Sequence, residues 1–321
     1  MQKPKVFVTR QIPEKGLGLV RDYCEADVWP GELPPSREDL LMRLRNVEGV
    51  LSLLTDRLDG AAMDAAPRLR VISNMAVGVD NVDLEAASAR KIPVGNTPGA
   101  MTDATADMTF ALMMAAARRV VEGERYVRDG KWKTWSPQLL LGADFSGGTW
   151  GIIGFGRIGR AVAKRCQGFD LRVIYYDPEA RPDLGATPVS LEELLGTSDF
   201  ISLHVPLTSE TYHMIDAQTL SEMKPGAVLV NTSRGPVVDA EALYAALKSN
   251  SIFAAGLDVT EPEPLPPDHP LLELENCVIV PHLGSASKRT RDQMAYLAAQ
   301  NLIAGLKGER LPNCVNPEVY T

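Results

Sequence analysis

Short apolar runs alternate with helical stretches in the first third of the chain. The apolar runs lie at 5–9, 26–29, 49–53, 70–74 and 92–95, and amphipathic stretches lie between them at 13–22, 36–47 and 84–91. Ser36 followed by Asp39 is typical of a helix start, because a small hydroxyl can accept a hydrogen bond from the first turn. This alternation predicts a parallel sheet that is covered by helices.

A long segment rich in alanine, methionine and leucine follows, and we expect one helix over 103–128. The next segment, 130–147, contains Trp132, Trp135 and the three leucines 139–141 without a clear period. Because large apolar groups are usually covered, this segment is either folded on its own domain or is an arm that contacts a second copy.

The same alternation restarts at 149. Strands are expected at 149–153, 172–176, 200–204, 227–231, 254–258 and 278–280, followed by a final helix at 288–306. That helix needs a partner for its apolar face, so we expect it to return to the first domain. The fold class is therefore α/β with two open parallel sheets.

Composition narrows the class of protein. The chain has 33 Lys and Arg against 41 Asp and Glu, a net charge of −8, which argues against a nucleic-acid partner. No apolar run approaches the roughly 20 residues of a membrane span, so no membrane partner is expected. The four cysteines are far apart, without the paired spacing of a metal site, and no signal peptide precedes them. We expect a cytoplasmic protein without a bound metal.

A glycine motif stands between an expected strand and an expected helix. It reads Gly154-Phe155-Gly156-Arg157-Ile158-Gly159. Glycines allow a tight turn, and the helix start presents free N–H groups to a pyrophosphate. Asp177 ends the next strand, 18 residues after Gly159, where an acid binds ribose hydroxyls and repels a 2′-phosphate. The pattern favours NAD(H) and leaves NADP(H) open, and Arg181 could soften that preference.

Polar side chains follow three later strands. Arg234 follows 227–231, the acids Glu261 and Glu263 follow 254–258, and His282 follows 278–280. Hydride transfer to a 2-oxo acid needs such a set: a guanidinium that binds the carboxylate, an imidazole that supplies a proton, and an acid that orients the imidazole. Spacing alone does not choose between the two acids. His204 also ends a strand and is expected near the cofactor, whereas His213 and His269 are expected at the surface.

The chain resembles the D-isomer-specific 2-hydroxyacid dehydrogenases over nearly its whole length. The likeness is carried by the glycine motif and by four further stretches: 75–81 (Met-Ala-Val-Gly-Val-Asp-Asn), 232–235 (Thr-Ser-Arg-Gly), 256–259 (Gly-Leu-Asp-Val) and 281–285 (Pro-His-Leu-Gly-Ser). The loop 261–272 and the helix around 290–294 are most similar to the glyoxylate/hydroxypyruvate reductase branch of that family.

The resemblance implies a division into two domains and a set of site residues. Residues 1–98 plus 287–321 would form a flavodoxin-like substrate-binding domain, and 99–286 a Rossmann NAD-binding domain, with a cleft between them. Segment 130–147 would be a dimerisation arm, and the protein a homodimer. The catalytic residues implied are Arg234, Glu263 and His282. The cofactor would be lined by Gly154, Gly156, Arg157, Ile158, Gly159, Asp177, Pro206, Thr211, Thr232, Asp258, Gly284 and Thr105. The substrate would contact Val77, Gly78, Arg234, His282, Ser285 and Leu54.

The activity implied is reduction of a short 2-oxo acid, glyoxylate or hydroxypyruvate, to glycolate or D-glycerate with hydride from NAD(P)H. Two alternatives stay open. One is a D-lactate- or D-3-phosphoglycerate-type dehydrogenase of the same family. The other is an NAD-sensing binding protein, which would give no turnover of the cofactor.

Overall fold

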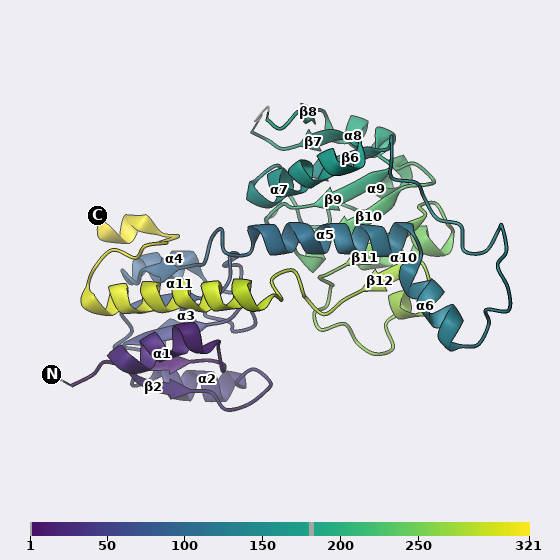
Figure 1. The fold of residues 1–321 in the computed structure, drawn as a ribbon. Coiled ribbons are helices and arrows are strands. Elements are labelled where there is room, and N and C mark those ends of the chain that lie inside the picture. The colour runs from purple at the N-terminus through teal and green to yellow at the C-terminus, as the bar shows by residue number, and fades with distance from the viewer. Residues whose placement is uncertain (1, 180–182) are drawn as a thin grey trace. The chain divides into compact units, whose positions relative to one another are not determined.

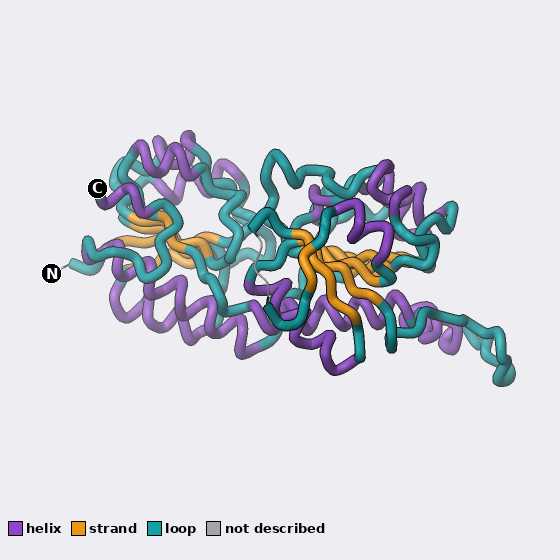
Figure 2. Tube along the Cα trace, turned by 90° about the horizontal axis from the view of Figure 1, so that it is seen from above, coloured by secondary structure: helices purple, strands orange, loops and turns teal. Residues whose placement is uncertain are grey.

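The computed structural model describes residues 2–179 and 183–321, and Arg181 lies outside the described residues. The chain divides into two compact units. Unit 1 comprises Met1–Met101 and Ser287–Thr321, and unit 2 comprises Thr102–Ala286. Each unit is built around one parallel sheet, and Figure 2 shows helices on both faces of each.

The sheet of unit 1 has five parallel strands in the order β2-β1-β3-β4-β5, which is the flavodoxin-like order. The strands are β1 (Lys5–Val8), β2 (Glu25–Val28), β3 (Gly49–Ser52), β4 (Val71–Asn74) and β5 (Val94–Gly95). Every residue of β3 and β4 is buried, as expected for strands that are covered on both faces. The α/β class predicted from the sequence is confirmed for this unit.

The helices of unit 1 cover both faces of its sheet (Figure 1). They are α1 (Glu14–Tyr23), α2 (Arg37–Leu44), α3 (Gly60–Asp64), α4 (Leu84–Ala89) and α11 (Lys288–Lys307), with a short 3₁₀ turn at Pro317–Tyr320. Ser36 caps α2 by accepting a hydrogen bond from the Asp39 N–H at 3.1 Å. The final helix α11 packs against α1 and against β3 and β4. Its apolar face is buried in the same core as Leu17 and Val71.

The sheet of unit 2 has seven parallel strands in the order β12-β11-β10-β9-β6-β7-β8. They are β6 (Thr149–Ile153), β7 (Arg172–Tyr176), β8 (Thr187–Pro188), β9 (Phe200–Leu203), β10 (Val228–Asn231), β11 (Ala254–Leu257) and β12 (Cys277–Ile279). The order reverses between β6 and β9, as in a Rossmann fold, and this is where such folds bind dinucleotides. In register, Asn231 lies beside Leu257 and Leu257 beside Ile279, so these strands end at one edge.

The helices of unit 2 are α5 (Thr102–Ala117), α6 (Val120–Arg128), α7 (Arg157–Cys166), α8 (Leu191–Thr197), α9 (Ala217–Glu222) and α10 (Ala240–Lys248), with 3₁₀ turns at Gln167–Phe169, Gly235–Val237 and Pro270–Glu273. Helix α5 packs on β10 and β11. Its Phe110 stacks on the buried Trp150 at 4.6 Å between ring centroids. None of the helices in the described part of the chain is long and apolar enough to cross a membrane.

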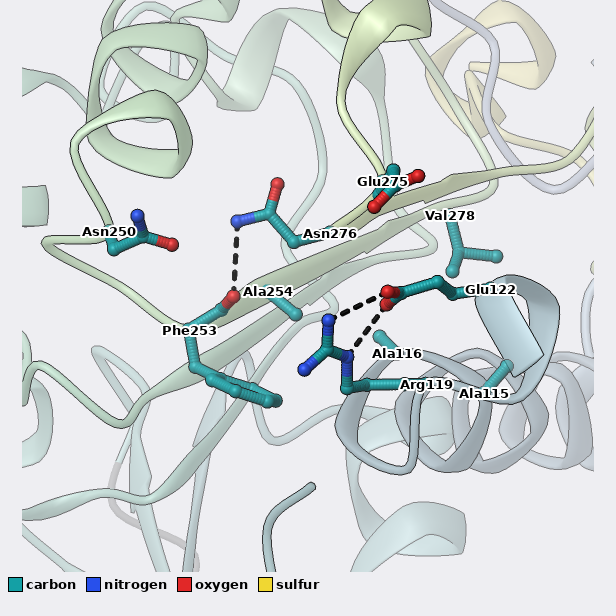
Figure 3. A pocket seen from close by; sticks show the side chains of 10 residues that line it. All are labelled: Ala115, Ala116, Arg119, Glu122, Asn250, Phe253, Ala254, Glu275, Asn276 and Val278. Atoms are coloured by element: carbon teal, nitrogen blue, oxygen red, sulfur yellow. Dashed lines mark hydrogen bonds and ion pairs between the residues drawn. The ribbon is translucent and has the colours of Figure 1, made fainter. Parts of the chain in front are cut away.

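The single helix expected over 103–128 is in fact two helices. Arg119 interrupts it with a left-handed backbone conformation, φ 52°. Its guanidinium donates two hydrogen bonds to Glu122, at 2.6 and 2.7 Å, which hold the turn (Figure 3). A pocket of about 90 Å³ lies beside this pair, against Phe253 and Asn276. Arg119 and Glu122 bind one another there, and the pair stabilises the break between α5 and α6.

Candidate active site

The centre of the candidate site is a hydrogen bond between His282 and Glu263. His282 Nδ1 lies 2.7 Å from Oε1 of Glu263. Glu263 belongs to the segment that follows β11, and His282 to the segment that follows β12. Between the two acids that the sequence left open, the geometry chooses Glu263, because Glu261 binds His213 instead, at 2.7 Å.

The backbone around His282 is held firmly by Asp258. The His282 N–H donates to the carbonyl oxygens of Asp258 and Val280, both at 3.0 Å, and the residue has a left-handed conformation with φ 53°. The buried carboxylate of Asp258 accepts hydrogen bonds from the N–H groups of Leu283 and Gly284, at 2.5 and 2.8 Å. Burial raises the pKa of Asp258 despite these two bonds. Asp258 therefore fixes the backbone that carries the imidazole.

Electrostatics link Arg234 to the same pair. Burial of Glu263 raises the pKa of its carboxyl, but the hydrogen bond with His282 and the charges of His282 and Arg234 lower it more. The net pKa of Glu263 lies below its ordinary value, so the side chain is ionised and accepts hydrogen bonds. It follows that Nδ1 of His282 carries a hydrogen, and that Nε2 is the ring atom left for a substrate.

A cavity of about 370 Å³ opens beside His282 and Glu263. Its wall is otherwise mostly apolar, with Leu265, Leu272 and Pro281 among the residues that form it. The cavity thus combines three titratable groups, those of Asp258, Glu263 and His282, with a mostly apolar wall, which is the usual composition of a small-molecule site.

The glycine motif has the geometry that a dinucleotide phosphate needs. Gly154 has φ +91°, and an added Cβ would lie 2.7 Å from the backbone of His204. Gly159 approaches Gly154 so closely that a Cβ would lie 2.2 Å from its carbonyl oxygen. Gly156 is the N-cap of α7, has no side-chain cap, and an added Cβ there would meet open space. The first-turn N–H groups of α7 can therefore receive a pyrophosphate.

Asp177 lies directly beyond β7, next to this motif. Its carboxylate accepts hydrogen bonds from the Phe155 N–H at 2.7 Å and the Glu179 N–H at 2.9 Å. Both contacts fix the carboxylate beside the glycine turn, the place where an acid meets a ribose. Of the other two motif residues predicted to line the cofactor, Arg157 is exposed and Ile158 is partly buried.

Four of the predicted cofactor residues come together on one side of unit 2. The hydroxyl of Thr105, on α5, donates to the Gly284 carbonyl at 3.3 Å, and an added Cβ at Gly284 would lie 2.8 Å from Asp258. Thr109, one turn along α5, lies 3.0 Å from the hydroxyl of Thr232. Sequence reasoning missed Thr109. A buried threonine four residues after Thr105, on the same face of an apolar helix, is the signal that could have found it.

Pro206, Thr211 and His204 lie in or beside the loop after β9. The Thr211 hydroxyl donates to the Pro206 carbonyl at 2.6 Å, so these two predicted cofactor residues share one turn. His204 Nε2 lies 3.0 Å from the hydroxyl of Ser202, and burial lowers the pKa of His204 to about 3. This histidine is therefore neutral, and within the described residues its buried Nδ1 has no hydrogen-bond partner.

Three predicted substrate residues belong to unit 1. Leu54 follows β3 in a turn whose Leu53 N–H is bound by Asp56 at 2.7 Å, and Leu54 is 39% exposed. Val77 and Gly78 follow β4, and their carbonyls accept hydrogen bonds from Asn96 and Asn74. In unit 2, Ser285 is buried two residues after Leu283. The contact of these four residues with substrate stays a prediction.

The chain is similar to a known family, and to named relatives over nearly its whole length. The family described as "D-isomer specific 2-hydroxyacid dehydrogenase, NAD binding domain" matches residues 110–284. A glyoxylate reductase of Korarchaeum cryptofilum is 56% identical over 322 residues, covering 99% of this chain and 97% of that protein.

Solved structures agree with this result. The TT0316 protein of Thermus thermophilus superposes with a TM-score of 0.93 at 51% identity, covering 97% of this chain and 99% of that one. An NADPH-dependent glyoxylate/hydroxypyruvate reductase of Sinorhizobium meliloti, solved with NADP and malonate, has a TM-score of 0.86 at 33% identity, covering 99% and 98%. The chain is a member of the D-isomer-specific 2-hydroxyacid dehydrogenase family.

Proposed function

We propose that this protein is a glyoxylate reductase, which converts glyoxylate, and hydroxypyruvate as a second substrate, to the 2-hydroxy acids glycolate and D-glycerate with NAD(P)H. The observation that carries the proposal is the 2.7 Å hydrogen bond between His282 and an ionised Glu263. The glyoxylate reductase of Korarchaeum cryptofilum, at 56% identity, supports the substrate class.

His282 acts as the general acid in this proposal. Its Nδ1–H donates to Glu263, so Nε2 faces the substrate and gives its proton to the oxygen of the 2-oxo group as that oxygen gains charge. The carboxylate of Glu263 stabilises the protonated ring and keeps it in one orientation. With its pyrophosphate bound at the glycine motif, the cofactor would supply the hydride from its nicotinamide to the carbonyl carbon.

Arg234 is the residue proposed to bind the substrate carboxylate. A guanidinium can donate two parallel hydrogen bonds to a carboxylate, which fixes the position of the neighbouring carbonyl as well as its charge. In addition we assign the backbone N–H groups of Val77 and Gly78 to the same carboxylate, with Leu54 and Ser285 as further neighbours of the substrate.

The cofactor preference proposed is NADH over NADPH. Asp177 supports it, because the carboxylate is fixed beside the glycine turn by the Phe155 N–H. A negative charge there accepts bonds from ribose hydroxyls and repels a 2′-phosphate. The other residues that the resemblance implies as cofactor contacts are proposed to bind the cofactor as well.

Residues 1–98 with 287–321 are assigned to substrate binding and residues 99–286 to NAD binding, which is the division that the sequence predicts. The segment 130–147 is assigned as the arm of a homodimer. A cytoplasmic location is proposed on the four widely spaced cysteines.

The test is an assay of NADH and NADPH oxidation with a panel of 2-oxo acids. Glyoxylate should be reduced, and His282→Gln should lower the rate by on the order of 10²–10⁴. A wild-type protein that binds NADH but turns over no 2-oxo acid would refute the proposed activity. Near-normal turnover by the variant would remove His282 from its role.

A further inference from the structure

His213 stands at the junction of the two segments that carry the proposed catalytic side chains. Its backbone N–H donates to the carbonyl of Pro236, two residues after Arg234, at 2.8 Å. Its Nε2 lies 2.7 Å from Oε2 of Glu261, two residues before Glu263. The expectation that His213 lies at the surface holds only in part, because 30% of its side chain is exposed.

The backbone contact of His213 is part of a longer pairing. The Ile215 N–H donates to the Val237 carbonyl at 3.1 Å, and the Asp239 N–H returns a bond to the Ile215 carbonyl at 2.9 Å. The segment with His213 is thus joined by three backbone hydrogen bonds to the segment after Arg234. The ring of His213 also stacks on Tyr212, with centroids 4.0 Å apart and an interplanar angle of 14°.

The side-chain contact of His213 concerns a short turn that carries two acids. Glu261 and Glu263 are two residues apart, and of the two only Glu263 is hydrogen-bonded to His282, whereas Glu261 is hydrogen-bonded to His213. The other end of the His213 ring faces a further carboxylate, since Nδ1 lies 3.9 Å from Asp239. His213 therefore lies between the carboxylates of Glu261 and Asp239, and its hydrogen bond fixes the direction of the Glu261 side chain.

We infer that His213 is a positioning residue of the reaction: it binds Glu261 and thereby fixes the turn so that Glu263 faces His282. The inference rests on the proposed function, because it assigns His213 a part in the same chemistry. His213 is not placed in contact with the substrate or the cofactor. Its effect on the rate passes through the orientation of Glu263, and a small displacement of a catalytic group is enough to slow a reaction strongly.

The variants to compare are His213→Leu, which removes the bond, and His213→Gln, whose amide keeps an N–H donor for Glu261. We expect His213→Leu to lower kcat for glyoxylate by about tenfold with KM for NADH nearly unchanged, and His213→Gln to recover most of the loss. Glu261→Leu should match His213→Leu, and the double variant should be no worse than either single one.

The matched control is Lys224→Leu. Lys224 forms a partly exposed ion pair with Asp199 at 3.0 Å in the same unit, and neither residue belongs to the proposed site. Loss of an ion pair of this kind by itself contributes little to stability. Lys224→Leu should therefore leave kcat at the wild-type value.

A second readout does not depend on turnover. In protein labelled with ¹⁵N-histidine, the ring signals of His282, identified by their loss in His282→Gln, report its hydrogen bond to Glu263. They should shift in His213→Leu and Glu261→Leu and stay in place in His213→Gln. The inference would be overturned if the wild type is active and both leucine variants have the same kcat and the same His282 signals as the wild type. An inactive wild type would refute the proposed function, and the His282 signals would still decide the role of His213.

Discussion

At the scale of single residues, the proposed chemistry depends on one carboxylate that is kept ionised in a partly buried place. Glu263 lies 2.7 Å from His282. Burial raises the pKa of Glu263, but the hydrogen bond with His282 and the charges of His282 and Arg234 bring the pKa below its ordinary value. Glu263 therefore carries a negative charge beside the imidazole of His282.

Replacing Glu263 by Gln tests the need for that charge. Without the carboxylate, the imidazole loses the negatively charged acceptor that orients it, and kcat should fall by on the order of a hundredfold. The measurement is kcat at neutral pH with glyoxylate and saturating cofactor.

The control for this experiment is Glu273→Gln. Glu273 is an exposed acid at the end of the 3₁₀ turn Pro270–Glu273, which lies between β11 and β12 as Glu263 does, so the variant loses the same charge without touching His282. Its kcat should equal that of the wild type. A Glu263→Gln variant with the kcat of the wild type would show that the carboxylate does not assist the proton donor.

Asp177 offers a separate test of cofactor choice. Asp177→Asn keeps an oxygen that can accept the Phe155 N–H bond, but it removes the charge that would repel a 2′-phosphate. The ratio of kcat/KM for NADPH to that for NADH should rise by about tenfold, equivalent to about 1.4 kcal/mol. Glu192→Gln, an exposed acid of α8, is the matched loss of charge. Equal ratios in the wild type and Asp177→Asn would assign the preference to other residues.

At the scale of elements, the site is built from the ends of neighbouring strands and from one close backbone contact. Gly235, directly after Arg234, lies so near the turn with Glu263 that an added Cβ would be 1.9 Å from the Thr260 carbonyl oxygen. A backbone atom cannot move aside as a flexible side chain can. The absence of a side chain at 235 thus lets the segments of Arg234 and Glu263 meet.

Gly235→Ala should therefore separate these segments. We expect a loss of roughly 1–3 kcal/mol in stability from the forced shift, together with a larger fall in kcat than in the binding of NADH. Thermal unfolding and steady-state kinetics measure the two effects. Gly226→Ala is the control, because an added Cβ there meets no atom within 4 Å. Wild-type kinetics in Gly235→Ala would show that the two segments tolerate separation.

Several elements were predictable from the sequence because their signals are local. Buried strands such as β9 and β10 read as apolar runs, and the strand–glycine–helix order located the turn at Gly154. The choice between Glu261 and Glu263 was not predictable from spacing, because it depends on side-chain directions within one turn. The break at Arg119 was missed for a similar reason: neither glycine nor proline marks it, and the bond to Glu122 holds it.

At the scale of the whole molecule, the most exposed apolar side chains of unit 2 lie in and near segment 130–147. Trp135 is 77% exposed, and Trp132 and Leu141 are each more than half exposed. The helix before them, α6, buries none of its residues although it has an apolar side. Figures 1 and 2 show α6 and the following loop reaching away from the sheet of unit 2. An apolar surface of this kind favours a covering partner, and the proposed partner is a second copy.

The homodimer is tested by measuring mass in solution as concentration is lowered. The wild type should sediment at twice the mass of the chain. Buried tryptophans are typical anchors of interfaces and contribute about 2 kcal/mol or more each, so Trp135→Ser should raise the dimer Kd at least thirtyfold, that is, by about 2 kcal/mol. Leu33→Ser is the control, since Leu33 is 78% exposed but belongs to a loop of unit 1. A tryptophan that becomes buried when the dimer forms stabilises it, so removal of that tryptophan must weaken the dimer. If Trp135→Ser changes the mass as little as Leu33→Ser does, segment 130–147 is not the interface.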